Sequence, residues 1–449
     1  MGEPEPTVPS GRLSVGGLLT YLRRHPVGFW FIFWGELAER CAFYGVRTLL
    51  FVYLTKVLLF EKYQATSVSA TYKAGCFLTP LLGGFLADRF FGKYWTIVAF
   101  SIPYVCGMLL LGVGTEYAVY GGLALLALGS GVIKPNISTL MGLTYDQRRP
   151  GEDRLRSDAF YVFYLAINIG SLVSSSLLPI VAKPDGYFGD RGFRVGFLIT
   201  AGLMSLALVL FAAGKRYYAV EHVRNRTPIT PTERAERWNV LSRLGGLFLL
   251  VTFWWFAYEM KDNIWVAFAD QYIDLQVTET RSVQPNQLIA LNPIFIIILV
   301  PTINLFWKAI DPTGQRFPAP RKMLVGFGLM ILTYTLLSTA GFLATSTGSK
   351  STVIWMVAAF ISMTASEVMV SVVGLELAYR AAPQSMKGFI TACWLFTTFL
   401  ANFITVPVAR LKPYDNLGPG PFFAGVAGLM VINAIVLWFV GRRLARPAD

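Results

Sequence analysis

The sequence predicts an all-α polytopic membrane protein, with twelve transmembrane helices in two six-helix bundles. Three observations support this fold class. Of the 449 residues, 54% are hydrophobic and 14% are charged, whereas a soluble domain carries roughly 25% charged residues. Apolar runs long enough to cross a hydrocarbon core of about 30 Å recur along the whole chain. The basic residues concentrate in alternate loops, as the positive-inside rule describes.

The apolar runs give the expected elements in order. We expect transmembrane helices at residues 28–57, 64–88, 94–115, 118–143, 158–182, 194–214, 241–272, 285–307, 322–344, 352–379, 388–409 and 420–441. They divide the chain into a short cytoplasmic tail, a bundle, a cytoplasmic linker, a second bundle and a second tail: 1–27, 28–214, 215–240, 241–441 and 442–449. A surface helix fits the linker region from Pro231 to Arg243.

The net charge of +13 follows from this topology and does not require a nucleic-acid partner. If both termini are cytoplasmic, most of the 39 Lys and Arg residues fall in cytoplasmic segments. We therefore expect the lipid bilayer, and no nucleic acid, as a partner. The first apolar run is too long and too charged to be the apolar region of a cleavable signal peptide.

Cysteine and histidine provide no predicted metal site. All four cysteines fall within expected spans and lack metal-ligand spacing: Cys41, Cys76, Cys106 and Cys393. His25 and His222 lie at or outside the cytoplasmic boundary, so proton chemistry inside the membrane must use carboxylates. The sequence also has no nucleophile paired with a histidine and no phosphate loop, so we expect neither an enzyme nor a cofactor.

The first apolar run carries five polar residues on one helical face. Glu36, Glu39, Arg40, Tyr44 and Arg47 fall within an arc of about 140° on a helix. Charges in hydrocarbon are costly and need a reason to be there. One interpretation is a structural ion-pair group between packed helices. The other is a water-lined site that binds charge and titrates.

Further polar residues lie in later spans of the first half. The segment Gly83-Gly-Phe-Leu-Ala-Asp88-Arg-Phe-Phe-Gly-Lys93 predicts tight helix packing followed by a charged turn. Lys134 falls within the fourth span and needs an acidic partner there. In the fifth span, spacing places three residues on one face: Tyr161, Tyr164 and Asn168.

The second half has its own intramembrane polar set. In the seventh span, Glu259, Asp262 and Asp270 are expected to share a face, and Lys261 pairs with a neighbouring acid or with another helix. Other polar or aromatic candidates are spread over four spans: Trp255, Asn292 beside Pro293, Glu367 and Trp394.

Five blocks together resemble the proton-coupled oligopeptide transporters, the POT/PTR family of the major facilitator superfamily. They are Glu-x-x-Glu-Arg-x-x-Phe-Tyr-Gly from Glu36, Gly-x-Gly-x-x-Lys-Pro-Asn-x-Ser from Gly129, Phe-Tyr-x-x-Tyr-x-x-Ile-Asn-x-Gly-Ser-Leu from Phe160, Asn-Pro-x-Phe-Ile from Asn292 and Glu-x-x-x-Ser-x-x-Gly-Leu from Glu367. The blocks occur in the family's order over essentially the whole chain. The turn from Gly83 to Lys93 similarly resembles the loop signature of the superfamily.

The resemblance implies a major facilitator fold with a central cavity, and proton-driven import of di- and tripeptides by alternating access. It further implies a functional monomer in a bacterial inner membrane, with protons as the coupling ion. By position, the residues implied in proton coupling are Glu36, Glu39, Arg40, Lys134, Glu259 and Glu367.

The same resemblance assigns the substrate site by position. It implies that the peptide carboxylate binds Arg40, Arg47 and Lys134, and that Glu259 pairs with Arg47. The peptide amine is implied to bind Asn168, Asn292 and Glu367. The residues implied to line side-chain pockets are Tyr44, Tyr164, Trp255 and Trp394.

Several positions depart from the family pattern. Cys41 stands where Phe is usual, and Phe77 stands where a ligand-contacting Tyr is common. Lys73, Lys261 and Asp262 are additional intramembrane charges. These extra charges indicate either an added ion pair or an altered substrate range.

Alternatives remain open for single residues and for the function. Lys134 could pair structurally with Glu367 or with an acid of the first span, and Asn292 could cap a backbone bent by Pro293. The aromatic residues Tyr161, Tyr164, Trp255 and Trp394 could serve packing. A transporter of the same fold could carry nitrate, a modified amino acid or a drug-like compound, and a ligand-binding sensor is also compatible with the sequence.

Overall fold

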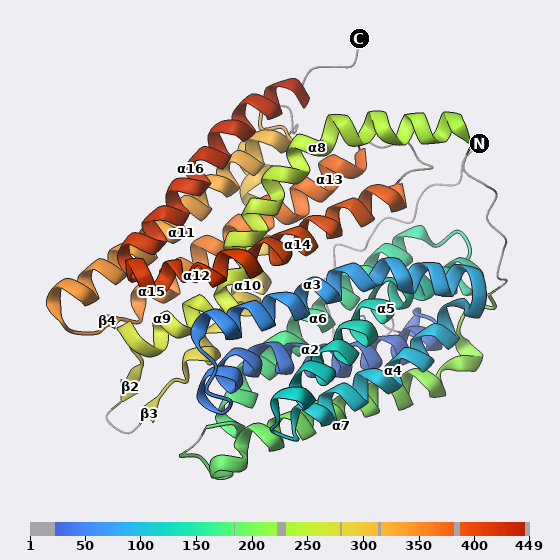
Figure 1. Ribbon diagram of the computed structural model, residues 1–449. Helices are drawn as coiled ribbons and strands as arrows, with labels where there is room; N and C mark the ends of the chain where they lie inside the picture. Colours follow the sequence, from blue (N-terminus) through green and yellow to red (C-terminus); the bar gives the residue numbers. More distant parts are fainter. Residues whose placement is uncertain are drawn as a thin grey trace, which may run out of the picture.

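The structure is a computed structural model that describes residues 23–183, 185–221, 230–278, 281–312, 316–380 and 387–444. Most of the two expected tails, 1–27 and 442–449, lies outside these residues, as does His222 in the linker. The chain folds into long helices that run roughly along one direction within each half (Figure 1).

Within residues 23–221 as described, the first half consists of six long helices: α2 (Val27–Lys56), α3 (Lys62–Leu86), α4 (Gly92–Leu111), α5 (Glu116–Arg148), α6 (Asp153–Val181) and α7 (Gly192–Ala213). Short turns of helix join some of them: η1 (Ala87–Phe91), η2 (Gly189–Arg191) and η3 (Lys215–Tyr217). Their facing apolar side chains make one continuous hydrophobic core, with α2 packed on α6 and α7. In a bilayer, close packing of these side chains, and not their removal from water, holds the helices together.

The second half repeats this architecture with more interruptions. Its elements are α8 (Pro231–Glu259), η4 (Met260–Asp262), α9 (Ile264–Tyr272), η5 (Pro285–Ala290), α10 (Leu291–Ile310), α11 (Ala319–Thr347), α12 (Ile354–Glu367), η6 (Val368–Val372), α13 (Val373–Arg380), α14 (Lys387–Arg410), α15 (Pro413–Leu417) and α16 (Pro419–Leu444). A second hydrophobic core lies among them. The expected helix from Pro231 is present, but it runs on into the seventh span without a break before Glu259.

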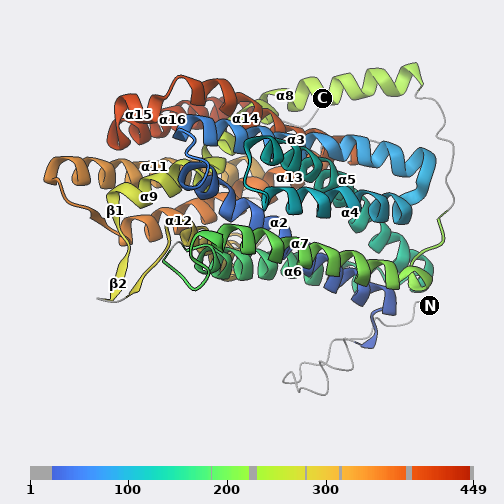
Figure 2. The ribbon, with the colours of Figure 1, turned by 60° about the horizontal axis from the view of Figure 1, so that its bottom comes forward.

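Two minimal strand pairs lie in the loops at one end of the second half. β1 (Ile273–Asp274) pairs in parallel with β4 (Ser351–Thr352), and β2 (Gln276–Thr278) pairs antiparallel with β3 (Arg281–Ser282). Figure 2 shows β2 standing clear of the helices. These strands were not predicted from the sequence, because two or three residues give no periodic signal.

Within the described residues, nine stretches are long and apolar enough to cross a membrane. One of them, Lys62–Leu111, contains both α3 and α4, so these stretches account for ten spans. α2 and α8 are the other two long helices of the expected twelve, and α2 carries five charged residues: Glu36, Glu39, Arg40, Arg47 and Lys56. The polytopic helical fold class is therefore confirmed.

The two halves meet through α3 on α14 and α6 on α10. Within the first half, the expected tight packing holds: a Cβ at Gly83 would lie 2.6 Å from the Val132 Cα, so only glycine permits this approach of α3 to α5. The charged turn after α3 is also present, because Lys93 Nζ lies 3.2 Å from Asp88 Oδ1.

Candidate functional site

The polar face of α2 is buried inside the first half. Arg40 Nε lies 2.9 Å from Glu36 Oε1 and 2.5 Å from Glu39 Oε2. All three side chains are at most 5% exposed, and Tyr104 donates a hydrogen bond of 3.0 Å to Glu39 Oε1. The predicted arrangement of two acids with one arginine on a single face is therefore confirmed.

Arg40 has unused hydrogen-bonding capacity. Its Nη2 and Glu36 Oε2 are both buried and lack a hydrogen-bond partner among the described residues. Gly170 of α6 packs directly on this point, because a Cβ there would lie 2.8 Å from Arg40 Cβ. A buried guanidinium that is incompletely satisfied is well suited to bind a planar anion such as a carboxylate.

Phe43 is a neighbour shared by the three predicted carboxylate-binding cations. Its ring centroid lies 4.1 Å from Lys134 Nζ, 5.3 Å from Arg40 Cζ and 5.9 Å from Arg47 Cζ. Such distances allow cation–π attraction. Sequence reasoning missed Phe43, although it lies within the first-span block.

The expectation that Lys134 requires an acidic partner is wrong. Among the described residues no carboxylate oxygen lies within 4.0 Å of its ammonium, and Lys134 rests instead between Phe43 and Phe77, whose centroid is 5.3 Å away. Neither the alternative pairing with Glu367 nor one with a first-span acid is present. Two aromatic faces stabilise the cation, so Phe77 contributes a π-face where the family pattern has a tyrosine.

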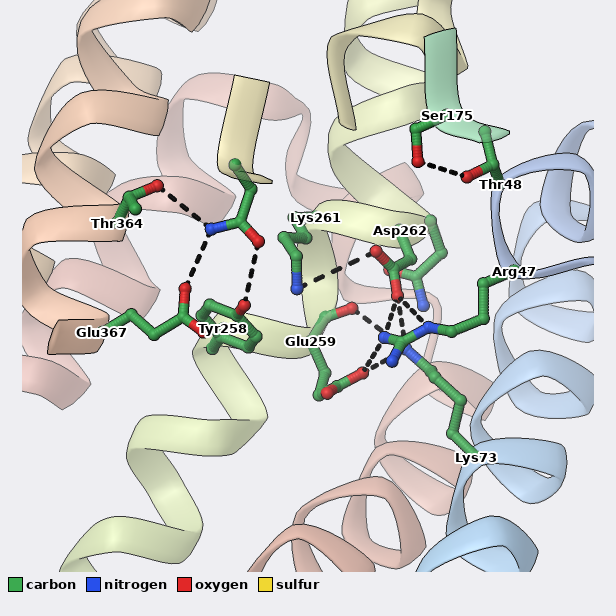
Figure 3. A network of polar contacts seen from close by, with 12 residues as sticks. Arg47, Thr48, Lys73, Ser175, Tyr258, Glu259, Lys261, Asp262, Thr364 and Glu367 are labelled. Atoms are coloured by element: carbon green, nitrogen blue, oxygen red, sulfur yellow. Dashed lines mark hydrogen bonds and ion pairs between the residues drawn. The ribbon is translucent and has the colours of Figure 1, made fainter. Parts of the chain in front are cut away.

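A group of five charged residues, which we call the inter-half charge cluster, joins the halves: Arg47 of α2, Lys73 of α3, and Glu259, Lys261 and Asp262 at the end of α8 (Figure 3). Arg47 Nη2 lies 2.9 Å from Glu259 Oε2, and Arg47 Nε donates to Asp262 Oδ2 at 3.1 Å. Lys73 Nζ lies 2.7 Å from Glu259 Oε2 and 3.6 Å from Asp262 Oδ2. The implied pairing of Glu259 with Arg47 is thus present, with an added lysine and an added acid.

A break in the seventh span positions the cluster. α8 ends at Glu259, η4 covers Met260–Asp262, and α9 begins after Asn263, whose side chain accepts a hydrogen bond of 2.7 Å from the Ile264 amide. Asparagine is a favoured residue at a helix N-cap. Because of this break, the prediction that Glu259, Asp262 and Asp270 share one helical face is wrong, and Asp270 lies apart from the cluster.

A second polar group lies within the second half, around Glu367 of α12. Asn292 of α10 donates hydrogen bonds from Nδ2 to Glu367 Oε2 at 2.8 Å and to Thr364 Oγ1 at 3.1 Å. Its Oδ1 accepts a hydrogen bond of 3.3 Å from the Tyr258 hydroxyl. Asn292 therefore bonds to side chains of α8 and α12, which contradicts the alternative that it merely caps the backbone at Pro293.

The remaining predicted site residues are more dispersed. Asn168 is buried on α6 and donates to the Tyr164 carbonyl at 3.0 Å, so the structure does not join it to Glu367. Tyr164 is 45% exposed. Trp394 is buried in the second core, with its ring tight against Gly374.

The aromatic candidates Tyr44 and Trp255 lie beside the two polar groups. Tyr44 packs at the first core, with its ring 5.3 Å from that of Phe43. The Trp255 ring lies 5.1 Å from that of Tyr258, and its indole nitrogen has no hydrogen-bond partner among the described residues. Its neighbour Trp254 instead donates to Ser366 Oγ at 2.9 Å.

Three further ion pairs connect the halves where α2 ends and α3 begins, and we call them the mouth ion pairs. They are Lys56 with Asp270 at 2.6 Å, Glu61 with Lys412 at 2.6 Å and Lys62 with Asp415 at 3.1 Å. In each pair one residue belongs to the first half and the other to the second. No local sequence pattern indicates them, because the partners are 214 to 353 residues apart along the chain.

The mouth ion pairs border a cavity of about 650 Å³ lined by residues of both halves, with Phe51, Phe60 and Val266 among its apolar residues. A pocket of about 40 Å³ lies beside it and is lined by residues from the mouth, such as Lys62, and from the cluster, Lys73 and Glu259. The smaller pocket is therefore lined by residues of both sets, and the inter-half charge cluster is the more buried of the two.

Comparison with known protein families agrees with the family resemblance found in the sequence. The POT family model, PTR2, matches residues 94–235 and 221–415. Solute carrier family 15 member 1 of Mus musculus is 30% identical over 366 residues, which cover 69% of this chain and 51% of the relative. Solute carrier family 15 member 2 of Homo sapiens is 27% identical over 360 residues, covering 69% and 48%. The chain spans about half the length of these curated relatives.

Solved structures of the same fold are also similar. The POT family transporter PepTSo is 27% identical, with a TM-score of 0.82 over 94% of this chain and 99% of that one. A POT family transporter in complex with a thioalcohol conjugated peptide has a TM-score of 0.80 at 20% identity, over 94% and 97%. The second likeness concerns the fold alone.

Proposed function

Since this chain belongs to the POT family, we propose that it is a proton-coupled symporter that imports di- and tripeptides by alternating access. In this proposal a peptide binds between the halves, with its carboxylate on the first half and its amine on the second. The halves then rock about the bound peptide, as expected for transporters built from two repeats.

The observation that carries the proposal is an incompletely satisfied cation on the first half and, among the described residues, a carboxylate without a close cation on the second. Arg40 and Lys134 lie on α2 and α5, where Arg40 has a buried donor without a partner. Glu367 lies on α12 and is held by the neutral amide of Asn292. A zwitterion that bridges the two would complete both sites and draw the halves together.

The proton-coupling part of the proposal rests on the acids of α2. Glu36 and Glu39 share one arginine in a buried environment. Protonation of either acid would remove one attraction on Arg40 and free it for a peptide carboxylate. Coupling of this kind links two binding free energies through one shared side chain.

We propose that the end of the bundle where α2 begins is cytoplasmic, and that the mouth faces outward. Basic residues gather at the proposed cytoplasmic end, where Arg24 pairs with Glu152 at 3.2 Å and Arg148 donates to the Arg216 carbonyl at 3.3 Å. This agrees with the positive-inside rule. We further propose a bacterial inner membrane and a functional monomer.

The test is uptake of a labelled dipeptide into proteoliposomes under an imposed inward proton gradient. The proposal predicts accumulation that stops when a protonophore collapses the gradient. A broad panel of di- and tripeptides should compete. Absence of gradient-stimulated uptake across that panel would contradict the proposal, and competition by nitrate alone would indicate a different anion as substrate.

A further inference from the structure

Lys261 lies at the boundary between the inter-half charge cluster and the polar group around Glu367. Figure 3 shows it between the side chains of Glu367 and Arg47. Its ammonium is 3.4 Å from the centroid of the Tyr258 ring and 3.9 Å from Asp262 Oδ1. The side chain is only 5% exposed. Among the described residues its ammonium makes no hydrogen bond, so the cation is loosely held by a π-face and a distant carboxylate.

Glu367 has the complementary deficiency. Its Oε2 accepts a hydrogen bond from Asn292, and among the described residues no cation lies within 4.0 Å of its carboxylate. Tyr258 contacts both polar groups, because the Lys261 ammonium lies over its ring while its hydroxyl donates a hydrogen bond to Asn292. Lys261 and Glu367 are therefore opposite charges on either side of one tyrosine.

Charge balance leads to the same pair. The cluster has three cations (Arg47, Lys73 and Lys261) and two anions (Glu259 and Asp262), which leaves one positive charge. Glu367 contributes one negative charge beyond Tyr258. The excess positive charge of the cluster is thus matched by the negative charge of Glu367 before any ligand binds, and buried charges interact more strongly than exposed ones.

We propose that Lys261 is a built-in cation of the site that receives the substrate amine, and that it extends the substrate range to carboxylates whose amine is blocked, such as N-acyl dipeptides. This inference rests on the proposed peptide transport. A peptide ammonium that approaches Glu367 must compete with Lys261 for electrostatic attraction to the carboxylate. A ligand without an ammonium leaves the charge of Glu367 balanced by Lys261, so the lack of that group costs little binding free energy.

The experiment compares two unlabelled competitors of labelled Ala-Ala uptake in proteoliposomes: Ala-Ala and N-acetyl-Ala-Ala. For the unmodified chain, we expect the two half-inhibitory concentrations to lie within about threefold of each other. In Lys261→Gln, the acetylated peptide should become at least about tenfold weaker relative to Ala-Ala, because Glu367 is then left without a cation. Lys261→Arg should retain the ratio of the unmodified chain.

Lys73→Gln is the matched control, because it removes another buried lysine of the cluster that does not contact Tyr258. Lys73→Gln lowers the charge of the cluster by the same one unit but leaves Lys261 over the Tyr258 ring. It should therefore lower uptake yet leave the ratio of the two competitors unchanged. If a variant no longer transports, binding of both compounds to the purified full chain, measured by calorimetry, gives the same ratio.

The outcomes separate this inference from the proposed function. An unchanged ratio in Lys261→Gln, or a tenfold preference for Ala-Ala already present in the unmodified chain, contradicts the role of Lys261 alone. Absence of both uptake and binding for the two compounds contradicts peptide transport and, with it, this inference.

Discussion

Two sets of ion pairs hold the same end of the two halves together, and they differ in burial. The inter-half charge cluster has side chains that are 4–12% exposed. In the mouth ion pairs the side chains are 28–61% exposed. Both sets bridge the halves with similar distances, so geometry alone does not rank them.

Burial ranks them. An exposed ion pair contributes about 0–1 kcal/mol, because water screens it and ordering two long side chains costs entropy. Removing one partner from a buried pair costs about 3–5 kcal/mol, because the other charge remains in a medium of low dielectric. We therefore expect the cluster, and not the mouth, to decide whether the halves separate at this end.

The largest effect is expected for Asp262→Asn. It leaves three cations facing Glu259 alone. We expect a loss of about 3–5 kcal/mol from the stability of the form in which the halves meet at the mouth ion pairs, here called the closed form. The unfolding temperature of the purified chain and its gradient-driven uptake should both decrease. The double variant Lys73→Met with Asp262→Asn removes one charge of each sign and should recover part of the loss. No recovery would show that Lys73 and Asp262 act independently.

A smaller effect on the closed form is expected for Glu36→Gln and Glu39→Gln, because these acids are buried but lie within one half. These two variants separate the effect of burying an ion pair from the effect of joining the two halves. Each variant should abolish concentrative uptake, since the proposed proton site is lost, while counterflow exchange of peptide persists in part. The readout is labelled peptide with and without a gradient. Concentrative uptake by both variants would contradict the proton role of these acids.

The smallest effect is expected when all three mouth ion pairs are removed by Lys56→Gln, Glu61→Gln and Lys62→Gln. Uptake should stay within about twofold of the unmodified chain. For the unmodified chain, in which this pair is intact, uptake measured across pH 5–8 should show no trend from Lys412, because hydrogen bonding to Glu61 raises the Lys412 pKa above its ordinary value. Such a pair stabilises below the ordinary lysine pKa of about 10.4 and is lost only as the pH rises past the raised value.

The sequence predicted the fold class and much of the first-half site, because long apolar runs and charges on one helical face are local patterns. Glu36, Glu39 and Arg40 are adjacent on one helix, so their contacts followed from helix geometry. The ion pair of Arg47 with Glu259 came from the family resemblance, since 212 residues separate the two.

The incorrect predictions share a physical cause, which is tertiary context. Lys134 is stabilised by the rings of Phe43 and Phe77 and not by an acid, and a ring face leaves no charge pattern in a sequence. The helix break at Met260–Asp262 turns Asp262 away from the face expected for a continuous helix. The next helix begins at the N-cap residue Asn263, which is one local contact and not a periodic pattern. The mouth ion pairs join helix ends and short connections of both halves, and their partners lie 214 to 353 residues apart, so no local pattern indicates them.

The most direct test of the account is the distance across the mouth, measured by electron paramagnetic resonance between spin labels at Leu59→Cys and Leu417→Cys. Both positions are exposed and flank the mouth ion pairs. The two native cysteines that are not buried, Cys106 and Cys393, would be replaced by serine. We expect one short distance between the labels in the unmodified chain and in the variant without mouth ion pairs. In Asp262→Asn we expect a second, longer distance in addition. Opening of the mouth variant with no change in Asp262→Asn would contradict the account.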